Sequence, residues 1–138
     1  MEPLAENRRA RFDYSILGTF EAGIELKGFE VKSVKLGRAN IAGSFAVPRD
    51  EELWLMNADI PPYQPLNTPD GYDPKRSRRL LVKHEEVMEY LGKVKSEKLT
   101  LVPLRMYNKR SLVKIEIALA RPKKKGDRRE AIQKRETK

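Results

Sequence analysis

The segment that most constrains the fold is residues 112–120, in which large apolar residues alternate with other residue types. Val113, Ile115, Ile117 and Leu119 occupy every second position of this run. Successive side chains of a β-strand point to opposite faces of a sheet, so this spacing predicts a strand with one buried face. We therefore expect a protein organised around β-sheet.

Other runs predict neighbouring strands. Residues 12–20 place Phe12, Tyr14, Ile16 and Phe20 on one face at the same period of two. Further apolar, β-type runs lie at 44–47, 53–56, 80–82 and 99–106.

Prolines indicate how some of these runs connect. The segment Pro48-Arg49-Asp50 lies between the runs 44–47 and 53–56 and predicts a hairpin turn. Pro103 interrupts a later run, which predicts an edge strand or a β-bulge there, because proline has no N–H to donate to a ladder.

Residues 84–96 carry the clearest helical signal. Val87, Tyr90, Leu91 and Val94 follow the i, i+3, i+4, i+7 spacing of an amphipathic helix. Acidic residues lie in its first turn and lysines near its end, which complements the helix dipole.

Glycine and proline positions predict the structure of two further segments. Residues 28–37, bounded by glycines, also suit a strand, but a short helix is the preferred interpretation. Residues 57–79 contain five prolines and are predicted to form a long loop, because proline interrupts both helix and central strand.

The order of these elements favours one OB-like antiparallel β-barrel with peripheral helices over residues 1–120. The pattern alone also fits an open α+β sheet. Residues 121–138 contain nine Lys or Arg and three acidic residues. Such a segment buries too little apolar surface to fold alone, so we predict a basic C-terminal tail, disordered when free and able to become helical against RNA.

Charge and composition narrow the class of partner. The 138 residues include 29 Lys and Arg against 20 acidic residues, a net charge of +9, which favours RNA, DNA or an anionic membrane surface. The absence of cysteine excludes disulfides and thiolate zinc sites. No apolar run is long enough to span a bilayer and no signal peptide is recognisable, so we expect a cytoplasmic protein.

The chemistry-bearing residues do not predict an enzyme. His84 is the single histidine, and it begins a charged helix where a solvated position is expected. The nearby Glu85, Glu86 and Glu89 fit a solvated helix face better than acid–base or metal chemistry. We expect no catalytic residues, no cofactor and no metal.

Basic clusters are more informative. They lie at 7–11, at 75–83 and in the tail, and each fits either phosphate contact or plain solvation on composition alone. Bases stack on exposed aromatic rings in RNA-binding barrels, and each candidate ring also fits a structural role. These candidates are Tyr14, Tyr63, Tyr72 and Tyr107.

Read together, several segments resemble the SsrA-binding protein (small protein B) family. The most specific is E-A-G-x-x-L-x-G-x-E-V-K-S at 21–33, preceded by N-R-R-A-R at 7–11. Later matches include D-P at 73–74, R-R-L-L at 78–81 and K-I-E-I-A-L-A at 114–120. The resemblance covers residues 7–138.

This resemblance implies a non-enzymatic adaptor. The barrel would bind the tRNA-like domain of tmRNA and help deliver the alanyl-charged RNA, with elongation factor Tu, to stalled ribosomes in trans-translation. The tail would occupy the decoding site and mRNA channel of the small ribosomal subunit.

The resemblance and the basic clusters together predict the site residues. The tmRNA-binding set is Asn7, Arg8, Arg9, Arg11, Tyr14, Glu21, Lys32, Ser33, Lys35, Asn40, Arg78 and Arg79. The ribosome-binding set in the tail is Lys123, Lys124, Lys125, Asp127, Arg128 and Arg129. Glu21 could accept hydrogen bonds from base amino groups or 2′-hydroxyls, or it could orient a neighbouring Arg or Lys.

The chain departs from the family pattern at several positions. Phe12 replaces a common histidine, Lys35 a usual arginine and Pro122 a common glycine, while Gly126 stands where many relatives carry His or Tyr. Competing functions are a general single-stranded RNA-binding or ribosomal protein, an RNA-processing enzyme, and attachment to a membrane surface through the tail.

Overall fold

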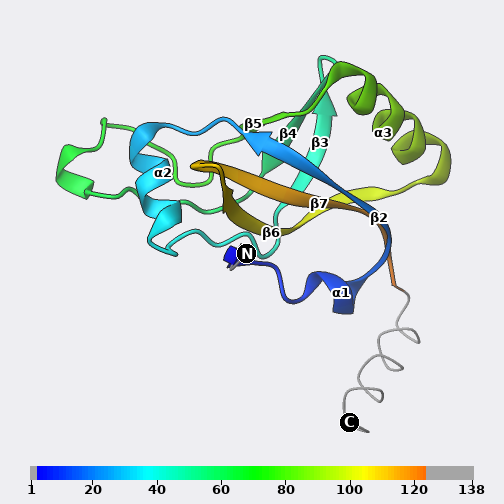
Figure 1. The fold of residues 1–138 in the computed structure, drawn as a ribbon, viewed down its shortest axis with the longest axis horizontal. Helices are drawn as coiled ribbons and strands as arrows, with labels where there is room; N and C mark the ends of the chain where they lie inside the picture. Colours follow the sequence, from blue (N-terminus) through cyan, green and yellow to red (C-terminus); the bar gives the residue numbers. More distant parts are fainter. Residues whose placement is uncertain (1–2, 124–138) are drawn as a thin grey trace, which may run out of the picture.

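The computed structural model describes residues 3–123 and arranges them as a closed but uneven ring of antiparallel strands (Figure 1). Around the ring the order is β6, β3, β4, β5, β2, β7 and back to β6, and β1 pairs with the remaining edge of β6. This confirms the predicted OB-like barrel. The strands are β1 (Pro3–Glu6), β2 (Tyr14–Ile24), β3 (Phe45–Arg49), β4 (Glu52–Met56), β5 (Arg78–Leu81), β6 (Thr100–Lys109) and β7 (Leu112–Pro122).

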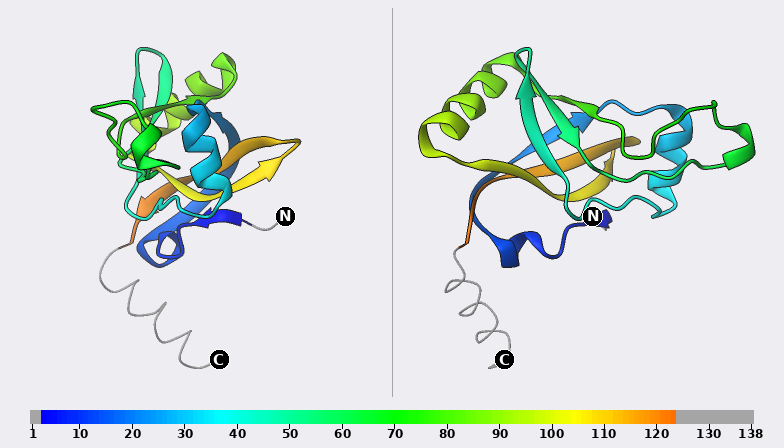
Figure 2. Two further views of the ribbon diagram at one scale, coloured as in Figure 1. Left: turned by 90° about the vertical axis from the view of Figure 1, so that its left-hand side faces the viewer. Right: turned by 180° about the vertical axis from the view of Figure 1, so that it is seen from behind.

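The peripheral helices lie at different ends of the barrel. Helix α2 (Gly28–Lys35) and the long loop 57–77 lie at one end, and α3 (His84–Glu97) lies at the other (Figures 1 and 2). Both helices confirm the sequence predictions. The loop is confirmed too, but it ends at residue 77 rather than 79, because β5 begins at Arg78, and it contains a short 3-10 turn at Pro65–Asn67. None of the helices within residues 3–123 is long and apolar enough to cross a membrane.

Two short elements near the N-terminus were not predicted. These are β1 and the one-turn helix α1 (Ala10–Asp13). Phe12 belongs to α1, so its predicted place in a strand is wrong. The predicted hairpin β3–β4 is confirmed, but Pro48 lies within β3 and the turn residues are Asp50 and Glu51, with φ of 53° and 62°. Positive φ at both central residues gives the turn whose twist matches two paired strands.

The main core fills the barrel. Its fully buried side chains come from opposite sides of the ring, among them Leu53, Leu55, Ile115 and Ile117. Helix α3 covers one end through its predicted apolar stripe, and its Tyr90 ring stacks on Phe20 with 3.9 Å between ring centroids. Burial of these apolar side chains supplies most of the stabilising free energy.

A second, smaller apolar cluster lies on the outer face of the barrel, beneath α1. Ala10 packs there against Val102, Leu104, Ala118 and Ala120. Tyr14 and Ile16 border this cluster. It attaches the N-terminal segment firmly to the outer face of β6 and β7.

A β-bulge in β2 changes which face its residues occupy. The pairing register with β7 shifts between Ile16 and Gly18. A shift of one residue reverses the face of every later side chain. Ile16 therefore faces outward, whereas Phe20 faces the core, and the predicted single face for residues 12–20 is wrong. The same reversal places Glu21 on the outer face, the face that Tyr14 also occupies.

A second bulge lies beside the first, in β6. The register with β7 shifts between Pro103 and Arg105, which confirms the bulge predicted from proline. Asn7 holds this irregular backbone: its N–H donates to the carbonyl of Leu104 at 2.8 Å and its side-chain Nδ2 donates to the carbonyl of Pro103 at 3.0 Å. Beyond the bulge, Met106 is buried in the core, and its neighbours in the strand face outward.

Strand β7 continues past the predicted domain boundary at residue 120. Pro122 is still paired with Tyr14, and Lys123 follows directly. The N–H of Lys123 donates to the carbonyl of Asp13 at 2.9 Å, and its Nζ donates to the carbonyl of Arg11 at 3.0 Å. The chain is therefore tied to the α1 segment where the predicted tail begins.

Candidate nucleic-acid interface

The outer face of the barrel carries a row of charged residues in register across four strands. Glu21 on β2 is paired with Glu116 on β7, Glu116 with Arg105 on β6, and Arg105 with Glu6 on β1. Directly paired residues point to the same face of a sheet, so these four side chains line up across it. Arg105 Nε lies 3.4 Å from a carboxylate oxygen of Glu116.

Tyr107 crosses this row. Its hydroxyl donates a hydrogen bond to Glu21, although β7 lies between their strands, so the ring spans β7. The Arg105 guanidinium lies over the ring, 4.7 Å from its centroid, and Tyr107 is only 4% exposed. Burial raises the pKa of Tyr107, and the hydrogen bond to Glu21 raises it further, so the hydroxyl keeps its proton and remains a donor.

Lys109 also binds Glu21. Glu21, Tyr107, Lys109 and Lys114 form a cluster that we call the Glu21 array. The Nζ of Lys109 lies 3.2 Å from both carboxylate oxygens of Glu21. The Tyr107 hydrogen bond is the main cause that lowers the pKa of Glu21. Burial opposes it, Lys109 and Lys114 lower the pKa further, and the net shift is downward. Gly23 lies beneath Lys114 and against Leu81: a Cβ at Gly23 would lie 3.6 Å from Lys114 Nζ and 3.2 Å from Leu81 Cβ. The carboxylate is therefore ionised and already engaged by its own protein.

The predicted N-terminal residues lie beside this array. Two hollows of the surface meet at Asn7: one is bordered by Arg9 and Tyr14, the other by Arg8 and Arg11. The side chains of Arg8 and Arg9 are 88% and 74% exposed. Arg8 lies 3.4 Å from Glu6 and Arg9 lies 3.7 Å from Asp13, distances typical of weak, exposed ion pairs. These guanidinium groups are accessible to phosphate.

A second group of predicted residues lies at the α2 end. Lys32 and Arg38 both approach the ring of Tyr63, at 5.4 and 6.0 Å from its centroid. Lys35 is exposed and donates to the carbonyl of Ser111 at 3.3 Å, in the turn between β6 and β7. The structure thus brings Lys35 to the tip of the β6–β7 hairpin and Lys32 to the long loop.

Asn40, the last predicted residue of this region, has a largely structural role. It forms an isolated backbone bridge with Asp59, and its side-chain oxygen accepts a hydrogen bond from the N–H of Ala42 at 3.0 Å. Asn40 is exposed beside α2 and the long loop.

Two predicted RNA-binding residues are buried. Ser33 and Arg78 have no exposed surface, so their predicted place on an RNA-binding surface is wrong. Ser33 lies on the face of α2 that packs onto the protein. Arg78 alternates with Arg79 along β5, and neighbouring residues of a strand point to opposite faces.

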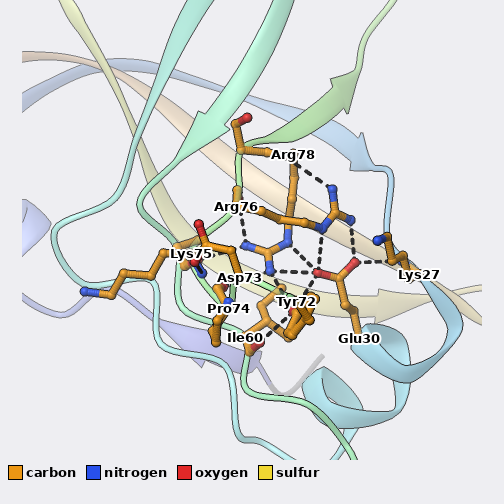
Figure 3. A network of polar contacts seen from close by, with 11 residues as sticks. Lys27, Glu30, Ile60, Tyr72, Asp73, Pro74, Lys75, Arg76 and Arg78 are labelled. Carbon is orange, nitrogen blue, oxygen red and sulfur yellow. Dashed lines mark hydrogen bonds and ion pairs between the residues drawn. The ribbon is translucent and has the colours of Figure 1, made fainter. Parts of the chain in front are cut away.

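Arg78 belongs to a buried polar network centred on Glu30 (Figure 3). Arg78 Nη2 lies 2.7 Å and Arg76 Nη2 lies 2.5 Å from the carboxylate of Glu30. The N–H of Lys27 donates to the same carboxylate at 2.7 Å, and the hydroxyl of Tyr72 lies 2.9 Å from it. Although burial alone would raise it, these hydrogen bonds lower the pKa of Glu30 to about 2. The network joins α2, the long loop and β5.

Arg79 is exposed, but its guanidinium forms ion pairs with two carboxylates. Its guanidinium lies 2.9 Å from Glu52 and 3.8 Å from Glu25. It projects outward from β5, on a different part of the barrel from the Glu21 array.

The structure also identifies surface cations that the sequence analysis did not select. These are Arg38, Arg105, Lys109 and Lys114. The alternation of Arg105, Tyr107 and Lys109 was a usable signal, because these residues share one face of a strand. Two of the predicted stacking rings have other roles: Tyr107 is buried under Arg105, and Tyr72 is engaged in the Glu30 network.

Within residues 3–123 no group of three or more His, Asp or Glu could hold a metal ion. His84 is exposed at the start of α3. Of the tail residues predicted to bind the ribosome, only Lys123 is described. Lys124, Lys125, Asp127, Arg128 and Arg129 lie outside the described residues.

Comparison with known proteins identifies relatives along nearly the whole chain. The SsrA-binding protein of Trichodesmium erythraeum is 48% identical over 135 residues, covering 98% of this chain and 86% of that protein. The SsrA-binding protein of Chlorobaculum tepidum is 52% identical over 133 residues, covering 96% of this chain and 84% of that protein.

Solved structures agree with these sequence relatives. A chain from a study described as "tmRNA-SmpB: a journey to the center of the bacterial ribosome" superposes with a TM-score of 0.71 at 47% identity, covering 92% of each chain. The sequence model of the SmpB protein family matches residues 4–138. With this barrel, this charged outer face and these matches, the chain belongs to the SmpB protein family.

Proposed function

We propose that this protein is a non-enzymatic adaptor that binds the tRNA-like domain of tmRNA and helps deliver it to stalled ribosomes for trans-translation. One observation carries the proposal: a preformed array of outward-facing cations, held by paired carboxylates, lies beside exposed arginines, on a barrel about half identical in sequence to SsrA-binding proteins. The protein would act in the cytoplasm, where ribosomes translate.

The chemistry of the outer face suits folded RNA. Arg8, Arg9 and Arg11 can bind phosphates, and each such contact releases counterions from the RNA. The Glu21 array adds fixed positive groups, Lys109 and Lys114, on the adjacent surface. A rigid pattern of cations recognises the shape of a folded RNA backbone better than a flexible one, because less side-chain entropy is lost on binding.

The remaining predicted residues are proposed as follows. Lys32, Lys35 and Asn40 would contribute a second contact at the α2 end, and Arg79 a peripheral one. The tail from Lys123 onward would enter the decoding centre and mRNA channel of the small ribosomal subunit. Elongation factor Tu would be an indirect partner, through alanyl-tmRNA.

One observation favours a second candidate, general binding of single-stranded RNA. The hollow beside Arg9 is lined by Tyr14 and Phe45, and Phe45 is 38% exposed. An aromatic ring next to a guanidinium fits an unpaired nucleotide of any sequence. A protein that worked mainly through this hollow would bind unstructured RNA at least as well as tmRNA.

The deciding experiment is competition binding. Labelled tRNA-like domain of tmRNA is titrated with the full-length protein at moderate salt, in the presence of excess ordinary tRNA or a single-stranded RNA of equal length. We expect binding that survives both competitors. Equal displacement by tRNA or by single-stranded RNA, with a steep salt dependence, would replace the adaptor role with general RNA binding.

A further inference from the structure

We propose that Glu21 is a positioning residue, and that Lys109, which it holds, is the group of this array that binds RNA phosphate. This inference rests on the proposed function and specifies which atoms of the same surface meet the RNA. It chooses between two roles for Glu21 that its sequence position alone leaves open, direct contact with RNA and orientation of a neighbouring cation.

The carboxylate of Glu21 is already engaged by neighbouring side chains. One oxygen accepts hydrogen bonds from Tyr107 and Lys109, and the other accepts from Lys109. A carboxylate has about four acceptor positions, so three of them are in use. The side chain of Glu21 is 37% exposed, and an ionised carboxylate repels the phosphates that dominate an RNA surface.

Lys109 is held by Glu21, but its hydrogen-bond donors are not all used. Its side chain is 42% exposed, and an ammonium group has three N–H donors. Two donors suffice for the oxygens of Glu21, which leaves a third free to point at a phosphate. A lysine fixed in this way loses less rotamer freedom on binding than an unrestrained surface lysine.

The Glu21 array lies on the outer face of the barrel. The two β-bulges turn Glu21 and Lys109 to the outer face, and Tyr107 spans the strand between them. Lys114 adds a second cation, whose Nζ lies over Gly23, 3.6 Å from where a Cβ of that residue would be. The array is therefore supported from beneath by a buried ring, and it presents two lysines beside the carboxylate of Glu21.

A double-mutant cycle tests the inference. Affinity for the tRNA-like domain of tmRNA is measured for wild type, Glu21→Gln, Lys109→Ala and the double variant, over a range of salt concentrations. The amide oxygen of glutamine can still accept from Tyr107 but no longer attracts the Lys109 ammonium. Thermal unfolding of each variant verifies that the barrel is intact.

We expect each single substitution to weaken binding by about tenfold, the magnitude of one well-placed phosphate contact, and the double variant to be no weaker than Lys109→Ala alone. Lys109→Ala and Glu21→Gln should each reduce the slope of log affinity against log salt by roughly 0.7 to 0.9, the value for one phosphate contact. A variant that is only less stable would bind less well, but its salt slope would not fall by the amount expected for one lost phosphate contact.

The exposed pair Glu89–Lys93 on α3 is a matched control. Its Nζ–carboxylate distance is 3.4 Å, and its side chains are exposed to a similar degree. Glu89→Gln and Lys93→Ala make the same chemical changes at the far end of the barrel, and we expect both to leave affinity within about twofold.

The outcomes separate this inference from the proposed function. If Glu21→Gln costs as much in the Lys109→Ala background as in wild type, Glu21 contacts RNA directly and the inference is wrong. If Lys109→Ala has no effect on affinity, the inference is also wrong, whereas the adaptor role stands. If wild type does not prefer tmRNA over tRNA, the proposed function fails, and the same cycle on any RNA that wild type binds still decides the role of Glu21.

Discussion

Glu30 shows how one residue can hold distant parts of a small protein together. Its carboxylate joins α2 to two arginines more than 45 residues later in the chain, and the hydroxyl of Tyr72 lies in the same network. Arg78 also donates to the carbonyls of Ala58 and Pro74. A buried arginine without its carboxylate is strongly unfavourable, so the two residues depend on each other.

The pKa of Glu30 predicts an acid-sensitive stability. It is about 2 in the folded protein against 4.5 for an ordinary glutamate. The stabilisation is therefore complete above pH 4.5 and is lost as the pH falls from 4.5 towards 2. We expect this group alone to lower the free energy of unfolding by roughly 3 kcal/mol across that interval. Urea unfolding at a series of pH values measures it.

Substitutions at Glu30 and its neighbour provide the control. Glu30→Gln leaves Arg78 unpaired and should cost about 3–5 kcal/mol of stability at pH 7. Tyr72→Phe removes only a hydroxyl and should cost about 1–2 kcal/mol, so it remains measurable if the first variant does not fold. An unchanged acid dependence in Glu30→Gln would assign the effect to other carboxylates.

At the scale of elements, the two β-bulges decide what the outer face presents. Tyr14 and Glu21 are seven residues apart and would lie on opposite faces of a regular strand. The register shift between Ile16 and Gly18 brings Tyr14 and Glu21 to the same, outer face. The shift after Pro103 turns Lys109 to that face too. The surface proposed to bind RNA therefore depends on two local irregularities of the sheet.

Asn7 holds the β6 bulge in place through its hydrogen bonds. Asn7→Ala removes the hydrogen bond to the carbonyl of Pro103 and should cost about 1–2 kcal/mol of stability. Amide exchange near Leu104 should become faster, and RNA affinity should fall because Arg105 and Lys109 are less well fixed. Hydrogen exchange and binding are measured on the same variant. Weaker binding with unchanged exchange and stability would mean that Asn7 contacts RNA itself.

At the scale of the whole molecule, the barrel is closed before the tail begins. Strand β7 completes the ring between β2 and β6 and ends at Pro122, and Lys123 is tied to the α1 segment. The apolar core and the proposed RNA-binding face both lie within residues 3–123. Folding and tmRNA binding should therefore not require the remaining residues.

Truncation after Lys123 tests this division. We expect the shortened protein to unfold at a similar urea concentration and to bind tmRNA within about threefold of the full chain at moderate salt, where unspecific attraction by the tail is screened. It should fail to support tagging of stalled peptides in a reconstituted translation system. Normal tagging by the shortened protein would contradict the proposed role of the tail.

The sequence by itself determined the elements whose signal is local. The alternation at 112–120, the helical stripe at 84–96 and the prolines of the long loop each report on a segment's own backbone, and the structure confirms all three. The bulge at Pro103 was also predictable, because the missing N–H of proline is a property of that residue. The N-terminal arginines, which are predicted to bind tmRNA, are exposed in the structure.

Only the tertiary structure decided which side chains reach the surface and which partners they find. Arg78 and Arg79 look alike in sequence, but strand register buries the first and exposes the second. Glu21 meets Lys109 only because two strands shift register against a third. Register depends on the whole set of paired strands and on the core they enclose, and no short segment carries that information.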